Sequence, residues 1–398
     1  MKALIVHNSY QQPGGEDVVV EQERSLLERG GHQVVLYRRS NWEVDGYSGL
    51  KRLALVRNTV WSSDARREIA GLLAREKPDV VHVHNTFVMI SPSIFSACQE
   101  AGIPVVLTLH NYRLLCPGAT FFRQGKVCEE CVEHNLWRSI RHACYRDSRP
   151  ETAVVALMLT VNNRRHTWTE CVNGFVALTN FARKKFIEGG LPAEKILVKP
   201  NFVHPDPGAR LEVGDYAVFV GRLSPEKRVS TLLAAWQRLR SHIPLLVIGG
   251  GPQLNDLQME AARLNLSTVR FEGRAQREQA IAAIKGASFL VFSSEWYETF
   301  GVTMAEAFAC GTPVICSRMG AMEEMVEDGR TGLHFTSGSP EDLTEKVEWA
   351  WSHPEAMREM GVECRREYEA KYTAERNYPM LMKIYEEVRA ARAPYHSN

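Results

Sequence analysis

Three segments in the second half of the sequence carry residue types that bind phosphates and sugar hydroxyls. The first, GRLSPEKRV, starts at Gly221 directly after the apolar run YAVFV and places Arg222 and Lys227 ahead of a helical pattern. Arginine offers phosphate oxygens a fixed fork of donors and lysine offers a mobile point charge, and a helix N-terminus already favours anions. The segment predicts a diphosphate site, with two solvated surface cations as the alternative.

The second segment is the glycine run Gly249, Gly250 and Gly251, which follows the apolar run LLVI. It lacks the third glycine of the G-x-G-x-x-G dinucleotide fingerprint, so it does not indicate NAD, and the sequence contains no P-loop. Glycine lets the backbone approach a ligand closely. A contact between Gly250 and a ligand is therefore one interpretation, and a tight turn is the other.

The third segment, SSEWYETFGVTMAEAFACGTPVI, begins at Ser293. Its pattern predicts a strand that ends near Ser293, a loop to Gly301, and a helix that Gly311 ends. Glu298 then lies in the loop and Glu306 inside the helix. A carboxylate accepts hydrogen bonds from two adjacent hydroxyls, such as those of a ribose. The placement of both glutamates at one strand–loop–helix junction predicts a sugar-nucleotide site.

The first half places further polar or flexible residues at the ends of predicted strands. Gly14 and Gly15 follow the first predicted strand and precede a helix, where backbone amides gather. His84, with Asn85 beside it, ends the run DVVHV, and His110 ends PVVLTL. A histidine at a strand end is more often structural than catalytic, and a glycine pair is usually a turn, so the residue types alone leave both interpretations open.

Taken together, GRLSPEKRVSTLL, the segment from Glu298 to Glu306 and the following GAMEEMVEDGRTGLHF resemble the retaining glycosyltransferases of family 4, which have the GT-B fold. The resemblance covers nearly the whole chain and is strongest from 221 to 335. It implies that Arg222 and Lys227 bind the donor diphosphate and that Glu298 lies near the donor sugar. It further implies that Glu306 holds the ribose.

Together with the residue types and positions above, the resemblance gives the complete sets of expected site residues. The expected catalytic residues are His110, Glu298, Arg222 and Lys227. The expected donor-binding residues are Gly14, Gly15, Gly221, Gly250, Phe300, Gly301 and Glu306. His84 and Asn85 are expected to contact the acceptor. His110 would position the reacting sugar or stabilise the transition state.

The implied reaction is transfer of a hexose from a nucleoside-diphosphate sugar, such as a UDP-sugar, to a hydroxyl of a saccharide or lipid-linked acceptor, with retention of configuration. We expect it to serve the assembly of a polysaccharide or another glycoconjugate of the cell envelope. Family members generally need no catalytic metal, and the sequence has no Asp-x-Asp motif. Two alternatives are a sugar-nucleotide epimerase on the same architecture and a non-catalytic sugar-nucleotide-binding protein.

Four cysteines lie in an insertion, residues 116–168, that interrupts the pattern of predicted strands. Cys116, Cys128, Cys131 and Cys144 give the spacing C-x11-C-x2-C-x12-C. Four thiolates can complete a structural zinc shell, which would stabilise an insertion with little apolar content. Ordinary thiols or a disulfide are the alternative.

Six arginines flank the apolar segment AVVALMLTV downstream of these cysteines. They are Arg138, Arg141, Arg146, Arg149, Arg164 and Arg165. The pattern suits a basic helix at a membrane surface, which would give the protein a peripheral membrane contact near a lipid-linked acceptor. It equally suits a core helix with solvated ends, which is the interpretation we favour.

Short apolar runs alternate with amphipathic stretches throughout, which predicts an α/β fold with parallel sheets. In the first half the predicted strands are Ala3 to Asn8, Gln33 to Tyr37, Asp79 to Val83, Val105 to Leu109 and Gly174 to Leu178. In the second half they are Tyr216 to Val220, Leu245 to Ile248, Val269 to Glu272, Phe289 to Phe292 and Pro313 to Cys316. Two such runs predict two doubly wound Rossmann-like domains facing each other across a cleft.

The predicted domains follow from the cluster of Pro and Gly at Val198 to Gly208. Residues 1–200 form the acceptor-side domain with its insertion, and residues 201–377 form the donor-binding domain. Residues 378–398 form a C-terminal helix that we expect to pack back on the N-terminal domain.

The bulk composition agrees with this organisation. A chain of 398 residues is too long for one ordinary core. The net charge of +1 gives no electrostatic case for a nucleic-acid partner. No apolar run approaches the roughly 20 residues that span a bilayer, and the N-terminus resembles a strand rather than a signal peptide. We therefore expect a cytoplasmic protein that works at the inner face of the membrane where its acceptor is lipid-linked.

Overall fold

The computed structural model describes residues 1–11 and 14–391, which form two compact units. Unit 1 consists of Met1–Phe121, Glu129–Pro200 and the chain from Asn377 onward, and unit 2 consists of Phe122–Cys128 and Asn201–Arg376. The main boundary therefore lies inside the predicted Pro- and Gly-rich segment. The short piece Phe122–Cys128 is grouped with unit 2, although the sequence suggested that it belongs with the first domain.

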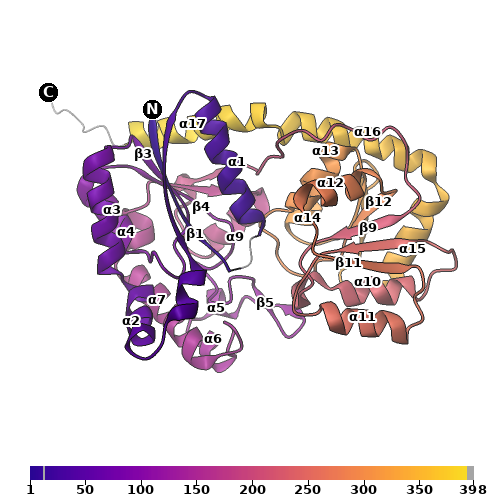
Figure 1. Ribbon diagram of the computed structural model, residues 1–398, viewed down its shortest axis with the longest axis horizontal. Helices are drawn as coiled ribbons and strands as arrows, with labels where there is room; N and C mark the ends of the chain where they lie inside the picture. The colour runs from indigo at the N-terminus through magenta and orange to yellow at the C-terminus, as the bar shows by residue number, and fades with distance from the viewer. Residues whose placement is uncertain (12–13, 392–398) are drawn as a thin grey trace. The chain divides into compact units, whose positions relative to one another are not determined.

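Unit 1 is built on a six-stranded parallel sheet in the order β2-β1-β3-β4-β7-β8 (Figure 1). Its strands are β1 (Lys2–Ser9), β2 (Gln33–Ser40), β3 (Val80–Asn85), β4 (Val105–Thr108), β7 (Gly174–Ala177) and β8 (Ile196–Val198). Ala3 pairs with Val34 on one side and with Val80 on the other. Every residue of β3 and β4 is buried. β4 begins as the continuous apolar run Val-Val-Leu, as strands covered on both faces do, whereas β3 also buries His82, His84 and Asn85.

The helices of unit 1 begin at residues that suit helix N-termini. They are α1 (Gly15–Arg29), η1 (Asn41–Gly46), α2 (Leu50–Val60), α3 (Ser63–Glu76), α4 (Ser93–Ala101), α5 (Glu130–Glu133), α6 (Arg138–Arg141), α7 (Arg149–Arg164), α8 (Thr167–Glu170), α9 (Asn180–Glu188) and η2 (Ala193–Lys195). The hydroxyls of Ser62, Ser148 and Thr179 accept backbone N–H groups at the starts of α3, α7 and α9. Each such cap satisfies an amide that the helix itself leaves without a partner.

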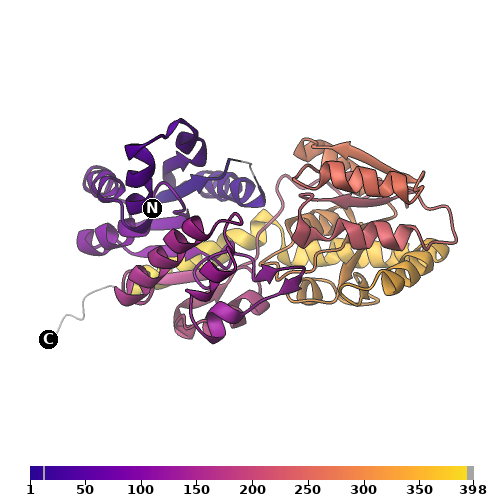
Figure 2. The ribbon, with the colours of Figure 1, turned by 90° about the horizontal axis from the view of Figure 1, so that it is seen from below.

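The last helix, α17 (Ala374–Ala390), packs on unit 1 from Asn377 onward (Figure 2). Tyr385 is fully buried, and its hydroxyl lies 2.8 Å from His82 Nδ1. Asn377 Nδ2 donates to the carbonyl of Pro200 over 2.6 Å. The C-terminal end of the described chain is thus part of the core of unit 1.

Unit 2 is also built on a six-stranded parallel sheet, in the order β11-β10-β9-β12-β13-β14. Its strands are β9 (Ala217–Val220), β10 (Leu245–Ile248), β11 (Val269–Gly273), β12 (Phe289–Phe292), β13 (Val314–Ser317) and β14 (Gly332–Phe335). Its helices are η3 (Pro225–Lys227), α10 (Val229–Trp236), α11 (Leu254–Arg263), α12 (Arg277–Lys285), α13 (Val302–Cys310), α14 (Ala321–Met325), α15 (Pro340–Ser352) and α16 (Pro354–Lys371). Figure 1 shows α12 and α13 on one face of the sheet and α10 and α11 on the other.

The strand order of each sheet reverses at one place. In unit 1 the reversal lies between β1 and β3, as in flavodoxin-like sheets, and in unit 2 it lies between β9 and β12, as in the Rossmann order. In open α/β sheets, ligands bind beyond the carboxyl ends of the strands at this switch point. The loops after β9 and β12 are the first and third segments that the sequence singled out.

The insertion contains a two-stranded hairpin, β5 (Phe122–Arg123) with β6 (Lys126–Val127), followed by short helices and α7. The apolar segment AVVALMLTV lies in α7, where Val155, Met158 and Leu159 pack against Phe87 in one hydrophobic cluster. The core-helix interpretation therefore describes this segment. Within the described ranges, no helix has the length and apolar character needed to span a membrane.

Candidate functional site

In unit 2, the loops after β9 and β12 bring Lys227 and Glu298 together as an ion pair. Glu298 is 5% exposed. The same carboxylate oxygen, Oε1, also accepts hydrogen bonds from Ser294 Oγ (2.9 Å) and from Trp296 Nε1 (2.8 Å). Three donors from two loops thus meet one carboxylate at the switch point: the Lys227 ammonium from the loop after β9, and the Ser294 hydroxyl and the Trp296 indole N–H from the loop after β12.

Lys227 is held in place by aromatic rings as well. Its ammonium lies 5.1 Å from the ring centroid of Phe292 and 5.5 Å from that of Trp296, distances at which the ring face attracts a cation. The ring faces and Glu298 therefore hold the ammonium at this position, which suits the diphosphate contact expected from the sequence.

Arg222, the other predicted diphosphate ligand, is exposed at the start of the same loop. Arg228 is engaged instead, because its Nε donates to Glu295 Oε2 over 2.6 Å and Thr231 Oγ1 donates to Glu295 Oε1 over 2.8 Å. The loop after β9 therefore presents Arg222 to solvent, while Arg228 binds the Glu295 side chain of the loop after β12.

Glu306 lies inside α13, as predicted, and is paired with Arg277 at the start of α12 by a 2.9 Å contact from Nε to Oε1. Burial raises the pKa of Glu306, and the charge of Arg277 with its hydrogen bond partly offsets that rise. Arg277 Nη1 donates to the carbonyl of His204 (3.1 Å), whereas its Nη2 is buried with no protein partner in the part of the chain that the structure describes. One guanidinium donor beside Glu306 thus remains for a polar ligand.

The glycine run after β10 has a structural explanation. Gly249 has a φ of +152°, and a Cβ there would overlap the carbonyl oxygen of Gly221, while a Cβ at Gly251 would overlap that of Leu223. The carbonyl of Gly250 accepts the N–H of Leu223 over 3.0 Å. The glycines let this loop pack against the backbone of the loop after β9, which is the tight-turn interpretation.

The start of α13 carries the other two predicted donor-binding residues. Phe300 is buried with its ring edge-on to Tyr372, 5.8 Å between centroids. The N–H of Gly301 points to Met325 Sδ at 3.5 Å. Thioether sulfur is a weak acceptor, so this amide gives up little when it turns to an oxygen.

In unit 1, Gly14 and Gly15 form the exposed N-terminus of α1. The N–H of Gly14 donates to Asp17 Oδ2 (2.9 Å), and Asp17 Oδ1 lies 3.0 Å from His7 Nε2. Burial works to raise the pKa of Asp17, but the hydrogen bonds from His7 and the Gly14 amide outweigh it and hold that pKa below its usual range.

The two histidines lie at the strand ends where the sequence predicted them, and they touch. His84 Nδ1 lies 2.9 Å from His110 Nε2. Asn85, expected to contact the acceptor, uses its side chain internally: Nδ2 donates to the carbonyl of Asn8 (2.8 Å) and Oδ1 accepts the N–H of Phe87 (3.0 Å). His84 and Asn85 are both buried, whereas His110 is half-buried.

A cavity of about 60 Å³ in unit 1 is lined by His84, Asn85, His110, Asn111 and Arg113, together with apolar side chains. Arg113 Nη1 donates to the carbonyl of Pro117 (3.0 Å), and its guanidinium lies 4.1 Å from the ring centroid of Phe87. The predicted His84 and His110 therefore share a polar hollow with an arginine that the sequence did not single out.

Among the four cysteines, Cys116 is buried and the other three are half-buried. Cys116 Sγ and Cys144 Cβ each lie 3.7 Å from the place that a Cβ on Gly118 would occupy, so these two cysteines are neighbours. Burial raises the pKa of the Cys116 thiol, and hydrogen bonds from backbone amides between Gly118 and Phe121 oppose that rise.

Several residues in these sites were missed from the sequence. They are His7, Asp17, Glu23, Arg113, Lys199 and Arg277. Most act as partners of a predicted residue, and they come from distant parts of the chain. Only Asp17 could have been found from its neighbours in the sequence: it lies at the third position of a helix with a glycine N-cap, where an acidic side chain accepts a hydrogen bond from the N-cap amide.

Two family models match the chain in succession. The model described as Glycosyltransferase Family 4 matches residues 13–207, and the one described as Glycosyl transferases group 1 matches residues 208–367. Among curated relatives, a glycosyltransferase of Methanocaldococcus jannaschii is 32% identical over 44% of this chain and 49% of its own length. The D-rhamnosyltransferase WbpZ of Pseudomonas aeruginosa is 31% identical over 40% of this chain and 42% of its own length. The chain thus spans about half the length of these relatives.

Solved structures resemble the whole chain. HepE of Anabaena in complex with UDP is 18% identical, with a TM-score of 0.66 over 97% of this chain and 100% of its own. Sucrose-phosphate synthase from Thermosynechococcus elongatus is 16% identical, with a TM-score of 0.73 over 98% of this chain and 99% of its own. At such identities the likeness concerns the fold, and it confirms the predicted GT-B architecture of two parallel-sheet α/β domains.

Proposed function

Because the chain belongs to glycosyltransferase family 4, whose models match its two halves in succession, we propose that it transfers a hexose from a nucleoside-diphosphate sugar to an acceptor hydroxyl with retention of configuration. The observation that carries this proposal is the convergence of Lys227 and Glu298 at the switch point of unit 2, next to the exposed Arg222. This is where a doubly wound sheet of this order binds its ligand.

The leaving diphosphate gains negative charge as the glycosidic bond breaks. Arg222 and Lys227 would bind that charge more strongly in the transition state than in the ground state, which is what accelerates the reaction. Glu298 orients Lys227 in the free protein and would turn toward the donor sugar when the diphosphate engages the ammonium. Amides at the start of α13, that of Gly301 among them, would add donors to the sugar or the phosphate.

Glu306 and Arg277 would hold the ribose. The carboxylate accepts hydrogen bonds from two adjacent hydroxyls, and the buried Nη2 of Arg277 supplies a donor beside it. UDP-sugars are the first donors to test, since HepE of Anabaena was solved with UDP and with UDP-glucose.

For the acceptor we propose a saccharide or lipid-linked glycan of a polysaccharide pathway. The names of two relatives support this class: one is O-antigen chain mannosyltransferase C of Escherichia coli, 28% identical over 44% of this chain and 48% of its own length, and the other is phosphatidyl-myo-inositol mannosyltransferase of Mycobacterium leprae, 28% identical over 56% of this chain and 61% of its own length. Unit 1, with its hollow beside His84 and His110, would receive the acceptor.

A structural zinc held by Cys116, Cys128, Cys131 and Cys144 is proposed as well. The proximity of Cys116 to Cys144 supports it. Backbone amides that face the Cys116 sulfur favour the thiolate that metals bind, against the burial that raises the pKa of this thiol. Metal analysis of the purified protein tests this: about one zinc per chain that is lost on replacing Cys128 and Cys131 by serine supports the site, and a metal-free folded protein contradicts it.

The proposed donor site is tested by calorimetric titration of UDP, GDP and ADP into wild type, Glu306→Ala and the exposed Glu278→Ala as a matched control. We expect one diphosphate to bind, and Glu306→Ala to weaken it by about 10- to 100-fold, the value of a hydrogen bond to a charged group. Glu278→Ala should bind as wild type does. Equal binding by wild type and Glu306→Ala would remove Glu306 from the donor site.

Transfer itself is then tested with the matching sugar nucleotides and a panel of saccharide acceptors, followed by NMR of the anomeric proton in the product. An α-linked product from an α-linked donor supports retention. Conversion of the donor sugar without an acceptor would indicate the epimerase alternative, and tight binding with no turnover would indicate a binding protein.

A further inference from the structure

The strand β11 forms an open edge of the sheet of unit 2. It is the first strand in the order β11-β10-β9-β12-β13-β14, and β10 is its one partner in the described chain. The backbone donors and acceptors of such an edge offer a place where another strand can pair. The five residues Val269–Gly273 alternate between half-buried and exposed, so one face of the strand is apolar and the other is polar.

The backbone of β11 directs the N–H and C=O of Phe271 to this open edge. The carbonyl of Thr268, just before the strand, accepts the N–H of Leu245 on β10 over 2.9 Å. Backbone groups of successive residues in a strand point to alternate edges. Those of Arg270 therefore face β10 as well, and those of Phe271 face away from it. Because Phe271 is the middle residue of β11, a strand that pairs here can be centred on it.

The polar face of β11 carries charges that are complementary to themselves. Arg270 and Glu272 stand on either side of Phe271, both are exposed, and they form an ion pair along the strand. When two copies of this strand run antiparallel with Phe271 opposite Phe271, residue 270 of each copy lies opposite residue 272 of the other. Two pairs of opposite charge then face each other across the strands, and such pairs stabilise a sheet.

The same charges select this alignment over its neighbours. Displacing one copy by two residues puts Arg270 opposite Arg270, or Glu272 opposite Glu272, and like charges in these positions destabilise the pairing. The other edge strands of the two sheets, β2, β8 and β14, have the sequences QVVLYRRS, ILV and GLHF without an acidic residue. Charge pairing of this kind is therefore confined to β11.

An apolar groove lies beside the same edge. It is a cavity of about 480 Å³ between α11 and β11, and its lining includes Ala261, Ala262, Leu266, Val269 and Phe271 but no charged residue. Directly opposed residues of an antiparallel pair place their side chains on the same face of the sheet. Phe271 and Val269 of a second copy would therefore lie on the face that carries this groove, where apolar side chains find apolar walls.

We propose that the edge of β11 is an interface between two copies of this chain, in which the strands pair antiparallel about a two-fold axis at Phe271 and join the two sheets of unit 2 into one. A two-fold interface uses the same patch of both copies, and a self-complementary strand provides such a patch. Backbone hydrogen bonds between the two Phe271 residues, two pairs of Arg270 with Glu272, and the filling of both grooves hold the copies together.

The strength of this dimer follows from its size. Each strand contributes five residues, and interfaces below about 1,200 Å² are typical of weak complexes. We therefore expect a dissociation constant of about 1–100 µM. Sedimentation velocity of the full chain from about 1 to about 300 µM brackets that range, and wild type should change from the mass of one chain to twice that mass.

Charge reversal tests the pairing. Arg270→Glu and Glu272→Arg each place like charges opposite each other at two positions and should weaken the dimer by about 10-fold or more. The double variant, Arg270→Glu with Glu272→Arg, exchanges the charges and should dimerise as wild type does. Arg358→Glu is the matched control, because Arg358 is a surface arginine that pairs with Glu355 along α16, and it should leave the dimer unchanged.

A mixture of the two single variants separates contacts between chains from those within one chain. Both variants lose the ion pair along their own strand, in the mixture as well as alone. In the mixture, however, a strand with two acidic side chains meets a strand with two basic ones. We expect a heterodimer at concentrations where neither single variant associates with itself, and only pairs between chains can produce it.

Three results would overturn the interface. They are a wild type that stays monomeric over the whole range, single variants that dimerise as wild type does, and a mixture or a double variant that does not recover the dimer. Equal urea midpoints of wild type and the variants at the lowest concentration show that the exposed substitutions leave the fold intact. None of these measurements needs a substrate, so the result is independent of the proposed transfer reaction.

Discussion

At the scale of residues, the two predicted diphosphate ligands of unit 2 stand in different electrostatic settings. Arg222 is exposed, whereas Lys227 is paired with the buried Glu298. The sequence identified both cations from their place between a strand and a helix. It did not identify their partners, because Glu298 pairs across 71 residues of chain and Glu306 finds Arg277 across 29, and only the fold brings such positions together.

This difference predicts separate effects on rate and stability. Arg222→Met should lower kcat by about 10²-fold, as loss of one charge-stabilising donor does, without changing the midpoint of urea denaturation. Lys227→Met should lower kcat similarly and also reduce the free energy of unfolding by about 3 kcal/mol, since it leaves the Glu298 carboxylate without its counter-ion.

The control for both is Arg238→Met, which changes a surface arginine paired with Glu341 and should alter neither quantity. An unchanged stability of Lys227→Met would mean that Ser294 and Trp296 alone suffice to hold the Glu298 carboxylate.

At the scale of elements, all ten predicted strands are present. Besides the two-residue strands β5 and β6 of the hairpin, the strands that were missed are β8 and β14 of the two six-stranded sheets. β8 has three residues and follows a turn of 3-10 helix, and β14 begins with Gly332. Both lie at an edge of a sheet. Edge strands of three or four residues are too short to show a periodic pattern, so the sequence alone does not reveal them. In contrast, α13 ends at Gly311 with a φ of +69°, the cap that the sequence predicted.

The packing of α7 gives a prediction that separates a core helix from a membrane-surface helix. Leu159 is fully buried in the cluster with Phe87, whereas Leu157 is 40% exposed. Leu159→Ala should lower the free energy of unfolding by about 2–5 kcal/mol, and the same change at Leu157 should stay within about 0.5 kcal/mol. Urea denaturation measures both. Equal, small effects would contradict the packing of α7 in unit 1.

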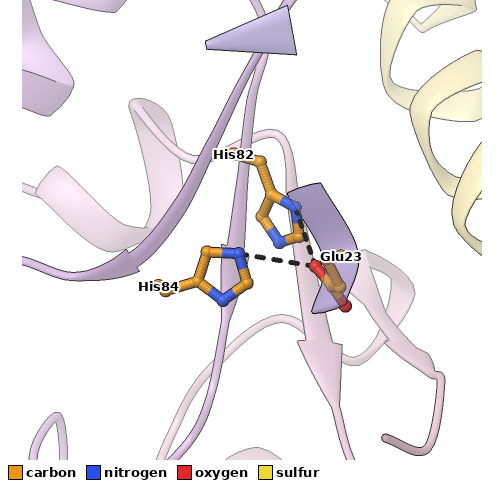
Figure 3. A group of neighbouring side chains, drawn as sticks. All are labelled: Glu23, His82 and His84. Atoms are coloured by element: carbon orange, nitrogen blue, oxygen red, sulfur yellow. Dashed lines mark ion pairs between the residues drawn. The ribbon is translucent and has the colours of Figure 1, made fainter. Parts of the chain in front are cut away.

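At the scale of the whole molecule, the sequence predicted two α/β domains, and it singled out the loops of unit 2 in which we propose the donor site. It did not predict that Lys199, Glu23, His82, His84 and His110 form one connected polar network inside unit 1. Figure 3 shows Glu23, His82 and His84 of this network. Apolar runs predict buried strands, whereas nothing in the sequence distinguishes a buried histidine or lysine from an exposed one. Such a residue can be buried only where groups of opposite charge or hydrogen-bond partners surround it, and these come from distant parts of the unit's sequence.

The network makes the stability of unit 1 depend on pH. Burial lowers the pKa of His82 from 6.5 to about 4, with Glu23 opposing this shift and Lys199 adding to it. Because the unfolded chain takes up the proton first, stability is full above about pH 6.5 and is lost as the pH falls toward 4, by about 3 kcal/mol for His82 alone.

Urea midpoints measured across this range should therefore fall with pH in wild type and fall less steeply in His82→Gln. Glu16, whose pKa burial raises well above its usual range, acts in the opposite sense, but it is common to both proteins and cancels in the comparison. Parallel curves for the two proteins would show that His82 is not held neutral.

The placement of α17 in unit 1 gives this chain an order of completion that runs against its order of synthesis. The residues that bury His82 and Lys199, Tyr385 and Asn377, emerge from the ribosome after all of Asn201–Arg376. Unit 2 can close its core while unit 1 still waits for its last helix, the reverse of the N-terminal-first order usual for domains. A variant truncated after Arg376 should therefore be cleaved by protease within unit 1 and remain intact within unit 2.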